Sequence, residues 1–423
     1  MIENRWDRVA LVSILVGAVV RIIWGLVIHP PLDHIYSDMG GYVERAQRLA
    51  TGAGLQRFDA FFPPGTHMVL SAPMTLFGTE RAGLWAGAVL WCALSAAIPL
   101  FAWRLARLLL TPAAAALTAL FCALWPLYIT YGGYFTSEIP SLAFLLASLW
   151  AGYRADRLSG WQAGWLGLTA GLLGGVAVAN RPQLILNLAV LAVPLLFRLR
   201  RQALALAGIA AGSALILAGT ALHNSAAAGK PTGLSENAGL NFWIGQCDVH
   251  DVTTADPARN ITFTFGNPVW AQLGRGGSYY FEGYLVWDQE FFYEMGLRCI
   301  ERNGLGHVRV LARSVLNMSA TTIPWPQVNE DGQRVVVRAS NLAYSLLLPL
   351  VVIDSVFIRR RASGRSPGET VMLLQLACVL VVAIFFFGDP RVRSSYDVFG
   401  LALLAARIAD RLSLDEPGEK PDE

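Results

Sequence analysis

The stretch VALVSILVGAVVRIIWGLVI, residues 9–28, decides the fold class of this chain. It is a nearly uninterrupted apolar run of about 20 residues, the length that an α-helix needs to cross the hydrocarbon core of a bilayer. Comparable runs recur along the 423 residues, of which 54% are hydrophobic and only 15% charged. In soluble domains about a quarter of the residues are charged. We therefore predict an all-α, polytopic membrane protein.

About ten apolar runs are the expected transmembrane helices, and the arginines between them set the orientation. The runs are Val9–Ile28, Gly83–Trp103, Pro112–Ile129, Ile139–Tyr153, Trp161–Ala179, Gln183–Phe197, Ala203–Leu222, Leu342–Ile358, Val371–Gly388 and Val398–Ile408. Alternate connections carry most of the arginines, and the positive-inside rule places those connections and both termini in the cytoplasm. The expected location is the inner (plasma) membrane. The net charge of +3 is too small to indicate nucleic-acid binding.

The connections divide the chain into four parts. These are a membrane module, an extracytoplasmic loop or lid with a membrane-surface segment, the C-terminal transmembrane helices and a disordered cytoplasmic tail, over residues 1–222, 223–341, 342–412 and 413–423. The first outer loop is expected to hold two helices on the membrane surface. Asp38–Ala50 is amphipathic, and Gly65–Phe77 is too short to span a bilayer.

The lid is the sizeable soluble part. Its many turn-forming residues predict a mostly irregular structure with one helix near Asp288–Glu301. The apolar piece His307–Trp325 contains two arginines and is expected to lie on the outer surface rather than cross. Cys247 and Cys299 both fall in the lid, where they are either a disulfide or two free thiols.

Two acids are expected on the outer side of the membrane. Asp38, in Ser37-Asp38-Met39-Gly40-Gly41-Tyr42, suits a general base that takes a proton from an acceptor group. The alternative is a helix N-cap. Glu138 stands where the fourth expected span enters the membrane, and there the alternative is an acid favoured by the helix dipole.

Three arginines on the same side oppose the inside bias. Arg181 lies in the tight turn Asn180-Arg181-Pro182, and Arg391 and Arg393 lie in Asp389-Pro390-Arg391-Val392-Arg393. Guanidinium groups bind phosphate in a bidentate manner, so we interpret them as contacts to an anionic, lipid-linked phosphate. The alternatives are a snorkelling or capping arginine at 181 and an ion-pair cluster of residues 389–397.

These motifs resemble the GT-C superfamily of integral membrane glycosyltransferases. The closer likeness is to the branch of protein O-mannosyltransferases and the lipid A aminoarabinose transferase (glycosyltransferase family 39-like). The matching stretches are Asp38 with Tyr42, Phe62-Pro63-Pro64-Gly65, Thr136-Ser137-Glu138, Asn180-Arg181-Pro182, residues 239–245 (GLNFWIG) and residues 389–393 (DPRVR). Two features depart from the pattern. Met39 stands where mannosyltransferases usually carry a second acid, and Ser394-Ser395-Tyr396 replaces the usual closing tyrosine and proline.

The resemblance implies a GT-C-like bundle and a glycosyl transfer at the outer face of the membrane. The donor would be a polyprenyl-phosphate-linked sugar, and the acceptor a lipid, a glycan or a protein. Transfer would invert the anomeric centre, with Asp38 as base, Glu138 as a second catalytic acid, and Arg181, Arg391 and Arg393 at the donor phosphate. The expected pocket residues are Tyr42, Glu44, His67, Asn241, Trp243 and Tyr396.

Other classes of protein fit parts of this pattern. A transporter or flippase of a lipid-linked substrate would explain the arginines but not the first-loop acid, and the chain has no internal repeat of the kind common in transporters. A ligase or polymerase of lipid-linked glycans would use a diphosphate donor. No metal-ligand spacing is visible among the histidines, so no cofactor is predicted, and the use of a divalent metal stays open.

Overall fold

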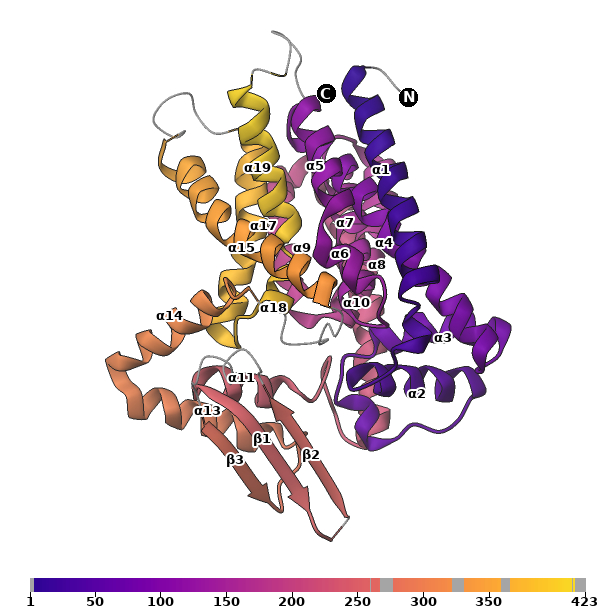
Figure 1. Ribbon diagram of the computed structural model, residues 1–423, viewed down its shortest axis with the longest axis vertical. Coiled ribbons are helices and arrows are strands. Elements are labelled where there is room, and N and C mark those ends of the chain that lie inside the picture. The colour runs from indigo at the N-terminus through magenta and orange to yellow at the C-terminus, as the bar shows by residue number, and fades with distance from the viewer. Residues whose placement is uncertain are drawn as a thin grey trace.

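A helical bundle carries a small α/β lid at one end (Figure 1). The computed structural model describes residues 4–258, 260–266, 277–321, 331–358, 366–412 and 414. The start of α1 (Arg5–Ile23) and the end of α19 (Asp397–Arg411) lie at the end of the bundle far from the lid. The predicted tail 413–423, apart from Leu414, and residues 322–325 of the predicted surface piece lie outside the described residues.

Every apolar run predicted from the sequence coincides with one or more helices. Within the described residues, six helical stretches are long and apolar enough to cross a membrane: Arg5–Asp33, Arg81–Leu109, Gly160–Asn180, Leu199–Ala228, Gln333–Phe357 and Pro367–Phe385. Shorter helices fill the bundle. The helices of the bundle are α1, a π-helical turn Trp24–Ile28, α4 (Arg81–Leu109), α5 (Pro112–Leu124), α6 (Pro126–Tyr131), α7 (Glu138–Ala155), α8 (Gly160–Asn180), a 3₁₀ turn Pro182–Leu184, α9 (Ile185–Leu196), α10 (Leu199–Ala228), α15 (Asp331–Ile353), a π-helical turn Asp354–Ile358, α17 (Pro367–Phe385), α18 (Pro390–Ser394) and α19. The number of ten transmembrane helices stays a prediction.

One predicted span, Pro112–Ile129, is two helices rather than one. The break falls at Trp125, whose backbone is extended, with ψ of 114°, directly before Pro126. A proline disfavours the helical conformation of the residue before it and cannot donate a backbone hydrogen bond. The apolar pattern continues through the break, so hydropathy alone did not reveal it.

Glycines bring α8 and α10 into close contact. A Cβ at Gly167 or Gly171 would overlap the backbone of α10, because the two helices approach without intervening side chains. In apolar surroundings the burial of side chains drives helix association only weakly, so small residues at the crossing provide the van der Waals contact. This pairing places the end of α8, and hence Arg181, against the rest of the bundle.

The first outer loop folds into the two predicted helices. They are α2 (Asp38–Thr51) and α3 (Gly65–Phe77), with 3₁₀ turns at Pro31–Asp33 and Arg57–Ala60. Gly52 adopts a left-handed conformation, with φ of 70°, and ends α2. The buried Arg45 of α2 lies 3.4 Å from the carboxylate of Asp59, which holds the helix against the loop that follows it.

The lid is more regular than predicted. Its three-stranded sheet has the order β2-β1-β3, with β1 antiparallel to β2 and parallel to β3. Its elements are α11 (Ala238–Gln246), β1 (Val249–Asp256), β2 (Ile261–Gly266), β3 (Gly277–Glu282), α13 (Gln289–Asn303), a 3₁₀ turn Gly304–His307 and α14 (Val308–Asn317). The helix predicted near 288–301 is confirmed as α13. The prediction that the lid is mostly irregular is wrong, because aromatic side chains form a second core there.

That second core explains the sheet. Trp243 of α11 is buried and packs within 5.5 Å, between ring centroids, of Tyr279, Phe281 and Phe292. Aromatic pairs in this geometry contribute beyond the area that they bury. The strands are separated in the sequence by turns, so their pairing depends on this packing and is not visible in local propensity.

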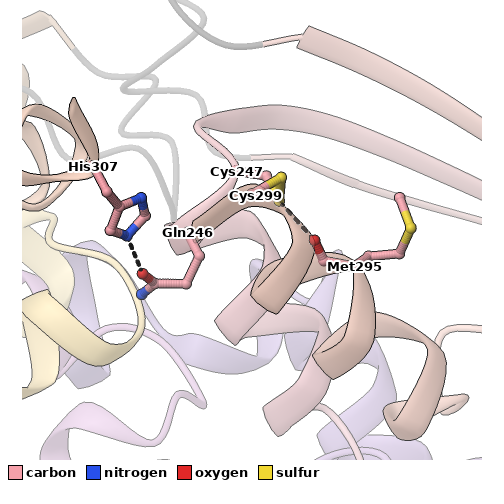
Figure 2. Close-up of a disulfide and its surroundings, with 5 residues drawn as sticks. All are labelled: Gln246, Cys247, Met295, Cys299 and His307. Carbon is pink, nitrogen blue, oxygen red and sulfur yellow. Dashed lines mark hydrogen bonds between the residues drawn. A yellow bond between two sulfur atoms is a disulfide. The ribbon is translucent and has the colours of Figure 1, made fainter. Parts of the chain in front are cut away.

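A disulfide closes the lid beside the bundle. Cys247 directly follows α11 and is bonded to Cys299 of α13, with the two Cα atoms 5.4 Å apart (Figure 2). The bond spans 52 residues of sequence. It therefore joins the end of α11 to α13, the two helices between which the three strands lie in the sequence.

Reduction of this disulfide is expected to loosen the lid. A crosslink over a loop of this length restricts the unfolded chain and typically stabilises a fold by about 2–4 kcal/mol. Thermal unfolding of the purified protein, with and without reductant, should show a lowered transition temperature on reduction. The Cys247→Ser/Cys299→Ser variant should unfold at that lower temperature and not respond to reductant. An unchanged transition in the reduced wild type would contradict the prediction.

Candidate active site

A cavity of about 400 Å³ opens where the end of the bundle meets the lid. Its wall includes Asp38 of the first outer loop, Arg181 and Arg391 of the bundle, and Asn237 and Asn241 of the lid. Small-molecule sites in proteins commonly begin at about 300 Å³ and combine an apolar lining with a few convergent polar groups. This cavity has both features, and three of the five charged residues that the sequence places on the outer side line it: Asp38, Arg181 and Arg391.

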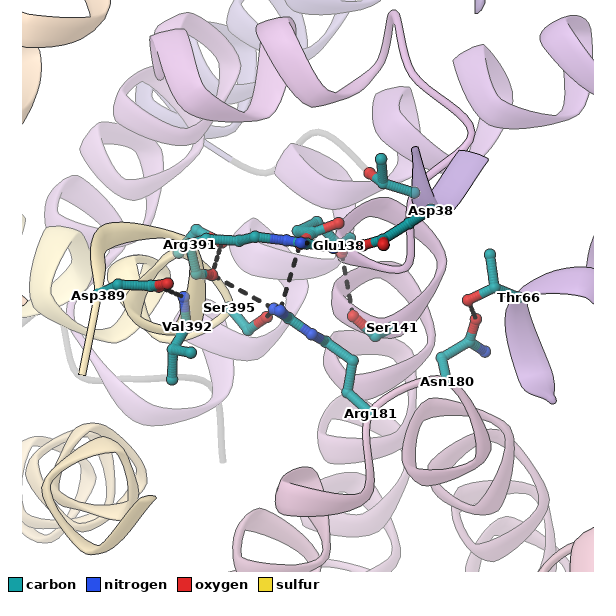
Figure 3. Close-up of polar contacts among 12 residues, drawn as sticks. Asp38, Thr66, Glu138, Ser141, Asn180, Arg181, Asp389, Arg391, Val392 and Ser395 are labelled. Carbon is teal, nitrogen blue, oxygen red and sulfur yellow. Dashed lines mark hydrogen bonds and ion pairs between the residues drawn. The ribbon is translucent and has the colours of Figure 1, made fainter. Parts of the chain in front are cut away.

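Asp38 is the first residue of α2 and lines the cavity. Its side chain points toward Glu138 and Arg391 (Figure 3). Its carboxylate accepts a hydrogen bond from Arg391 Nη1 at 3.3 Å, and its side chain is 24% exposed. Ser37, with φ of 51°, is the N-cap residue, so Asp38 does not occupy the N-cap position itself. The carboxylate is thus accessible to a ligand in the cavity and lies beside a guanidinium.

Glu138 lies behind the cavity wall as the first residue of α7. Its side chain is only 3% exposed, and Oε1 accepts hydrogen bonds from Arg391 Nε and from Arg181 Nη2, the latter at 3.2 Å (Figure 3). Burial raises the pKa of Glu138, but the two adjacent arginines outweigh burial and lower that pKa to about 2. Glu138 is therefore ionised at every pH near neutrality and holds both arginines together.

Arg181 follows the end of α8, in an extended backbone conformation before Pro182. Besides Glu138, it donates from Nη1 to Ser395 Oγ at 2.9 Å and to the carbonyl oxygen of Arg391 at 3.3 Å. The turn is held on its other side, because Asn180 Oδ1 accepts from Thr66 Oγ1 of α3 at 3.0 Å. Arg181 thus connects the α8–α9 turn to the segment that carries Arg391.

Arg391 is carried by the short helix α18. Asp389 caps that helix by accepting a hydrogen bond from the Val392 backbone N–H at 2.6 Å. The Arg391 side chain, 18% exposed, reaches between Asp38 and Glu138 and contacts both. A continuous chain of charges results, in the order Asp38, Arg391, Glu138, Arg181. Four segments far apart in the sequence supply one residue each.

Arg393 does not reach the cavity, although the sequence places it beside Arg391. Its guanidinium donates to Asp397 Oδ1 at 2.8 Å, to the carbonyl oxygen of Met318 at 2.7 Å and to Asn341 Oδ1 at 2.6 Å. The side chain is only 3% exposed. Of the expected ion-pair cluster in residues 389–397, the structure therefore forms the Arg393–Asp397 pair, which stabilises the fold.

Two of the predicted pocket residues line the cavity. Tyr42 of α2 and Asn241 of α11 both contribute to its wall. Burial and the neighbouring Asp38 raise the pKa of Tyr42, so its hydroxyl group stays protonated and can act as a neutral hydrogen-bond donor. Asn241 offers a neutral amide from the lid.

The other four predicted pocket residues lie elsewhere. Glu44 is 67% exposed and pairs with Arg48 on the outer side of α2. His67 is buried beneath α2, Trp243 lies in the lid core, and Tyr396 is buried in the bundle. None of the four is among the residues that line the cavity. In each case sequence proximity to a motif did not indicate which way the side chain points.

Sequence reasoning missed two contributors to the site. Ser395 holds Arg181, and it stands where the closing motif departs from the expected tyrosine and proline. Asn237 lines the cavity from the turn before α11 and looked like an ordinary turn residue. Within the described part of the chain, no group of three or more His, Cys, Asp or Glu residues could hold a metal ion.

Comparison with protein families finds one match. The profile of the dolichyl-phosphate-mannose-protein mannosyltransferase family matches residues 62–224. This stretch includes Glu138 and Arg181 but neither Asp38 nor Arg391. No curated protein matches the sequence.

Comparison with solved structures identifies the fold. The apo oligosaccharyltransferase of Archaeoglobus fulgidus matches 96% of this chain and 51% of its own, with 15% identity and a TM-score of 0.54. The same archaeal enzyme, AglB, in complex with an inhibitory peptide and a dolichol-phosphate, matches 96% of this chain and 50% of its own, with 14% identity and a TM-score of 0.55. This chain thus spans about half the length of those enzymes.

A third structure, ArnT from Cupriavidus metallidurans in the apo state, matches 97% of this chain and 81% of its own at 14% identity. Its TM-score is 0.39. The two oligosaccharyltransferase matches establish a fold of the GT-C type.

Proposed function

We propose that this chain, which has the GT-C fold, is a membrane glycosyltransferase that moves a sugar from a polyprenyl-phosphate donor to an acceptor. The observation that carries the proposal is the row of Asp38, Arg391, Glu138 and Arg181 at one cavity between bundle and lid. The match to a mannosyltransferase family supports it, as does the dolichol-phosphate in the complex of the archaeal oligosaccharyltransferase.

The donor phosphate binds beside Arg391 and Arg181, which both line the cavity. Two guanidinium groups supply several fixed hydrogen-bond donors, and they match the oxygens of a phosphate. As the bond between the sugar C1 atom and the phosphate oxygen breaks, the electron pair stays on the phosphate. Preorganised positive charge in a site with little water stabilises that developing charge.

Asp38 acts as the general base on the opposite side of the sugar. The acceptor oxygen attacks C1 from the face opposite the phosphate, and its proton passes to the Asp38 carboxylate. This single displacement inverts the anomeric centre. A base must come within about 3 Å of the proton that it removes. In the free enzyme the Arg391 guanidinium keeps the carboxylate in the cavity wall.

Glu138 is better suited to positioning than to the second catalytic role expected from the sequence. It is buried behind the wall, and it holds Arg391 and Arg181 through one carboxylate oxygen. A carboxylate that stays ionised keeps both guanidinium groups oriented before the donor arrives. Such preorganisation lowers the cost of arranging charges during the reaction.

The outer face of the membrane is the proposed site of the reaction. The cavity and the disulfide-bonded lid lie at the end of the bundle far from the start of α1 and the end of α19 (Figure 1). Disulfides persist in oxidising compartments, which supports an extracytoplasmic lid. In this orientation the α1 and α19 ends face the cytoplasm, as the arginine distribution predicts.

Transfer activity tests the proposal against its alternatives. The purified protein in lipid nanodiscs, given a polyprenyl monophosphate carrying a labelled sugar together with extracts of envelope lipids and glycans, is expected to release the label from the lipid. A flippase would move the intact donor in vesicles and release no sugar. A ligase or polymerase would act only on diphosphate-linked donors. Either result would contradict the proposal.

A further inference from the structure

Gln246, the last residue of α11, joins the lid to the bundle. Its side chain is buried, and Nε2 donates hydrogen bonds to the carbonyl oxygens of Ile384 and Phe385, both at 2.9 Å. These carbonyls belong to the last turn of α17, where backbone oxygens have no partner within their own helix. A lid side chain therefore caps a bundle helix.

His307 sets the orientation of that amide. His307 Nε2 and Gln246 Oε1 are 2.8 Å apart (Figure 2). Because both hydrogens of the amide nitrogen face carbonyl oxygens, Oε1 must accept the third hydrogen bond, and His307 must carry a proton on Nε2. The 3₁₀ turn that holds His307 leads directly into α14.

Helix α14 also contacts the end of α17 and the residues that follow it. Ser314 Oγ donates to the carbonyl oxygen of Ala383 at 2.6 Å and accepts from the Gly388 backbone N–H at 2.8 Å. A Cβ at Gly245 would overlap the carbonyl group of Phe386, so α11 and this segment touch through their backbones. Lid groups thus hold residues 383–388 at several points.

The held segment leads straight to the arginine of the site. Gly388 is followed by Asp389, which caps α18, and Arg391 lies in the first turn of that helix. A shift of residues 384–388 would move α18 and, with it, the Arg391 side chain between Asp38 and Glu138. The disulfide at Cys247 fixes the residue next to Gln246 to α13.

We propose that Gln246 is a positioning residue, which acts through the end of α17 to hold Arg391 at the donor phosphate. The inference rests on the proposed function, in which Arg391 binds that phosphate. It implies that the lid is part of the donor site although Gln246 itself does not line the cavity. A change in the lid anchor therefore changes donor affinity.

A double-mutant cycle tests this coupling. The donor dissociation constant is measured for the full-length protein in nanodiscs, with a polyprenyl-phosphonate sugar analogue that cannot react. Gln246→Ala should weaken binding about tenfold, the size of a lost buried hydrogen-bond network. In an Arg391→Ala background the same change should have almost no further effect, because the residue through which it acts is missing.

The matched control is Gln202→Ala. Gln202 is also buried and also donates from Nε2 to two backbone carbonyls, those of Asp156 and Leu158 at 2.8 and 3.1 Å, but it lies at the start of α10, far from the cavity. This variant should lower stability without changing donor affinity. If Gln246→Ala does not fold, His307→Ala removes the group that orients Gln246 and should give a smaller loss of the same kind.

The outcomes separate the two proposals. Fully additive effects of Gln246→Ala and Arg391→Ala on donor affinity would overturn the positioning role and leave the phosphate site intact. An unchanged affinity in Gln246→Ala would do the same. An Arg391→Ala variant that binds the donor as tightly as the wild type would overturn the phosphate site, and the positioning role would fall with it.

Discussion

Replacing Asp38 by asparagine is expected to abolish sugar transfer while the donor still binds. Asparagine has nearly the same shape as aspartate but cannot accept the acceptor proton, and a positioned general base contributes about 10²–10⁴-fold to a rate. The side chain is 24% exposed and its ion pair with Arg391 is 3.3 Å long, so little stability depends on it. Two quantities are measured for the purified variant: the rate of sugar transfer in a single turnover and the dissociation constant of the donor.

Donor affinity should stay the same or rise in Asp38→Asn. The substitution removes a negative charge next to Arg391, which leaves that guanidinium more available to the phosphate. Glu44→Gln is the matched control, because Glu44 lies on the same helix but is 67% exposed and paired with Arg48. It should transfer sugar at the wild-type rate. Retained turnover in Asp38→Asn would remove the base assignment.

Replacing Arg391 by alanine is expected to weaken donor binding and to slow transfer. Hydrogen bonds to charged groups contribute about 1.5–3 kcal/mol, which corresponds to roughly 10–100-fold in affinity. The rate should fall further, by about 10²–10³-fold, because the leaving phosphate loses a donor that matters most in the transition state. Equilibrium binding of the unreactive analogue and single-turnover kinetics would separate the two effects.

Two other variants sharpen that prediction. Arg391→Lys keeps the positive charge but loses the planar fork, so donor affinity should lie between those of the wild type and Arg391→Ala. Arg393→Ala should instead lower stability, because it leaves the fully buried Asp397 without its ion-pair partner. Its folded fraction should bind the donor normally. Equal losses of donor affinity in the Arg391 and Arg393 variants would contradict the site described above.

The two acids of the site differ in how far the sequence could predict them. Asp38 was recognisable because it begins an amphipathic helix directly after a transmembrane run, and the structure places it in the cavity wall. Glu138 was recognisable as an acid at a span entrance, but its burial behind two arginines depends on how α7, α8 and α18 meet. The position of a residue along the chain does not predict how these helices contact one another.

For the arginines too, the sequence did not predict which side chain would reach the cavity. Arg391 and Arg393 are two residues apart, and either could have been the phosphate ligand on charge alone. On a helix, residues at positions i and i+2 point to different sides. The Arg391 side chain therefore points to the cavity, whereas the Arg393 side chain points into the bundle and pairs with Asp397.

By itself, the sequence determined the class of fold, the positions of the apolar helices and the two helices of the first outer loop. These features follow from local properties, namely run length, helical periodicity and helix-ending residues. Only the tertiary structure decided the sheet of the lid, the choice between a Cys247–Cys299 disulfide and two free thiols, and the row from Asp38 to Arg181. These features depend on contacts between residues far apart in the chain. A hydropathy pattern shows which segments are apolar but not which distant segments contact each other.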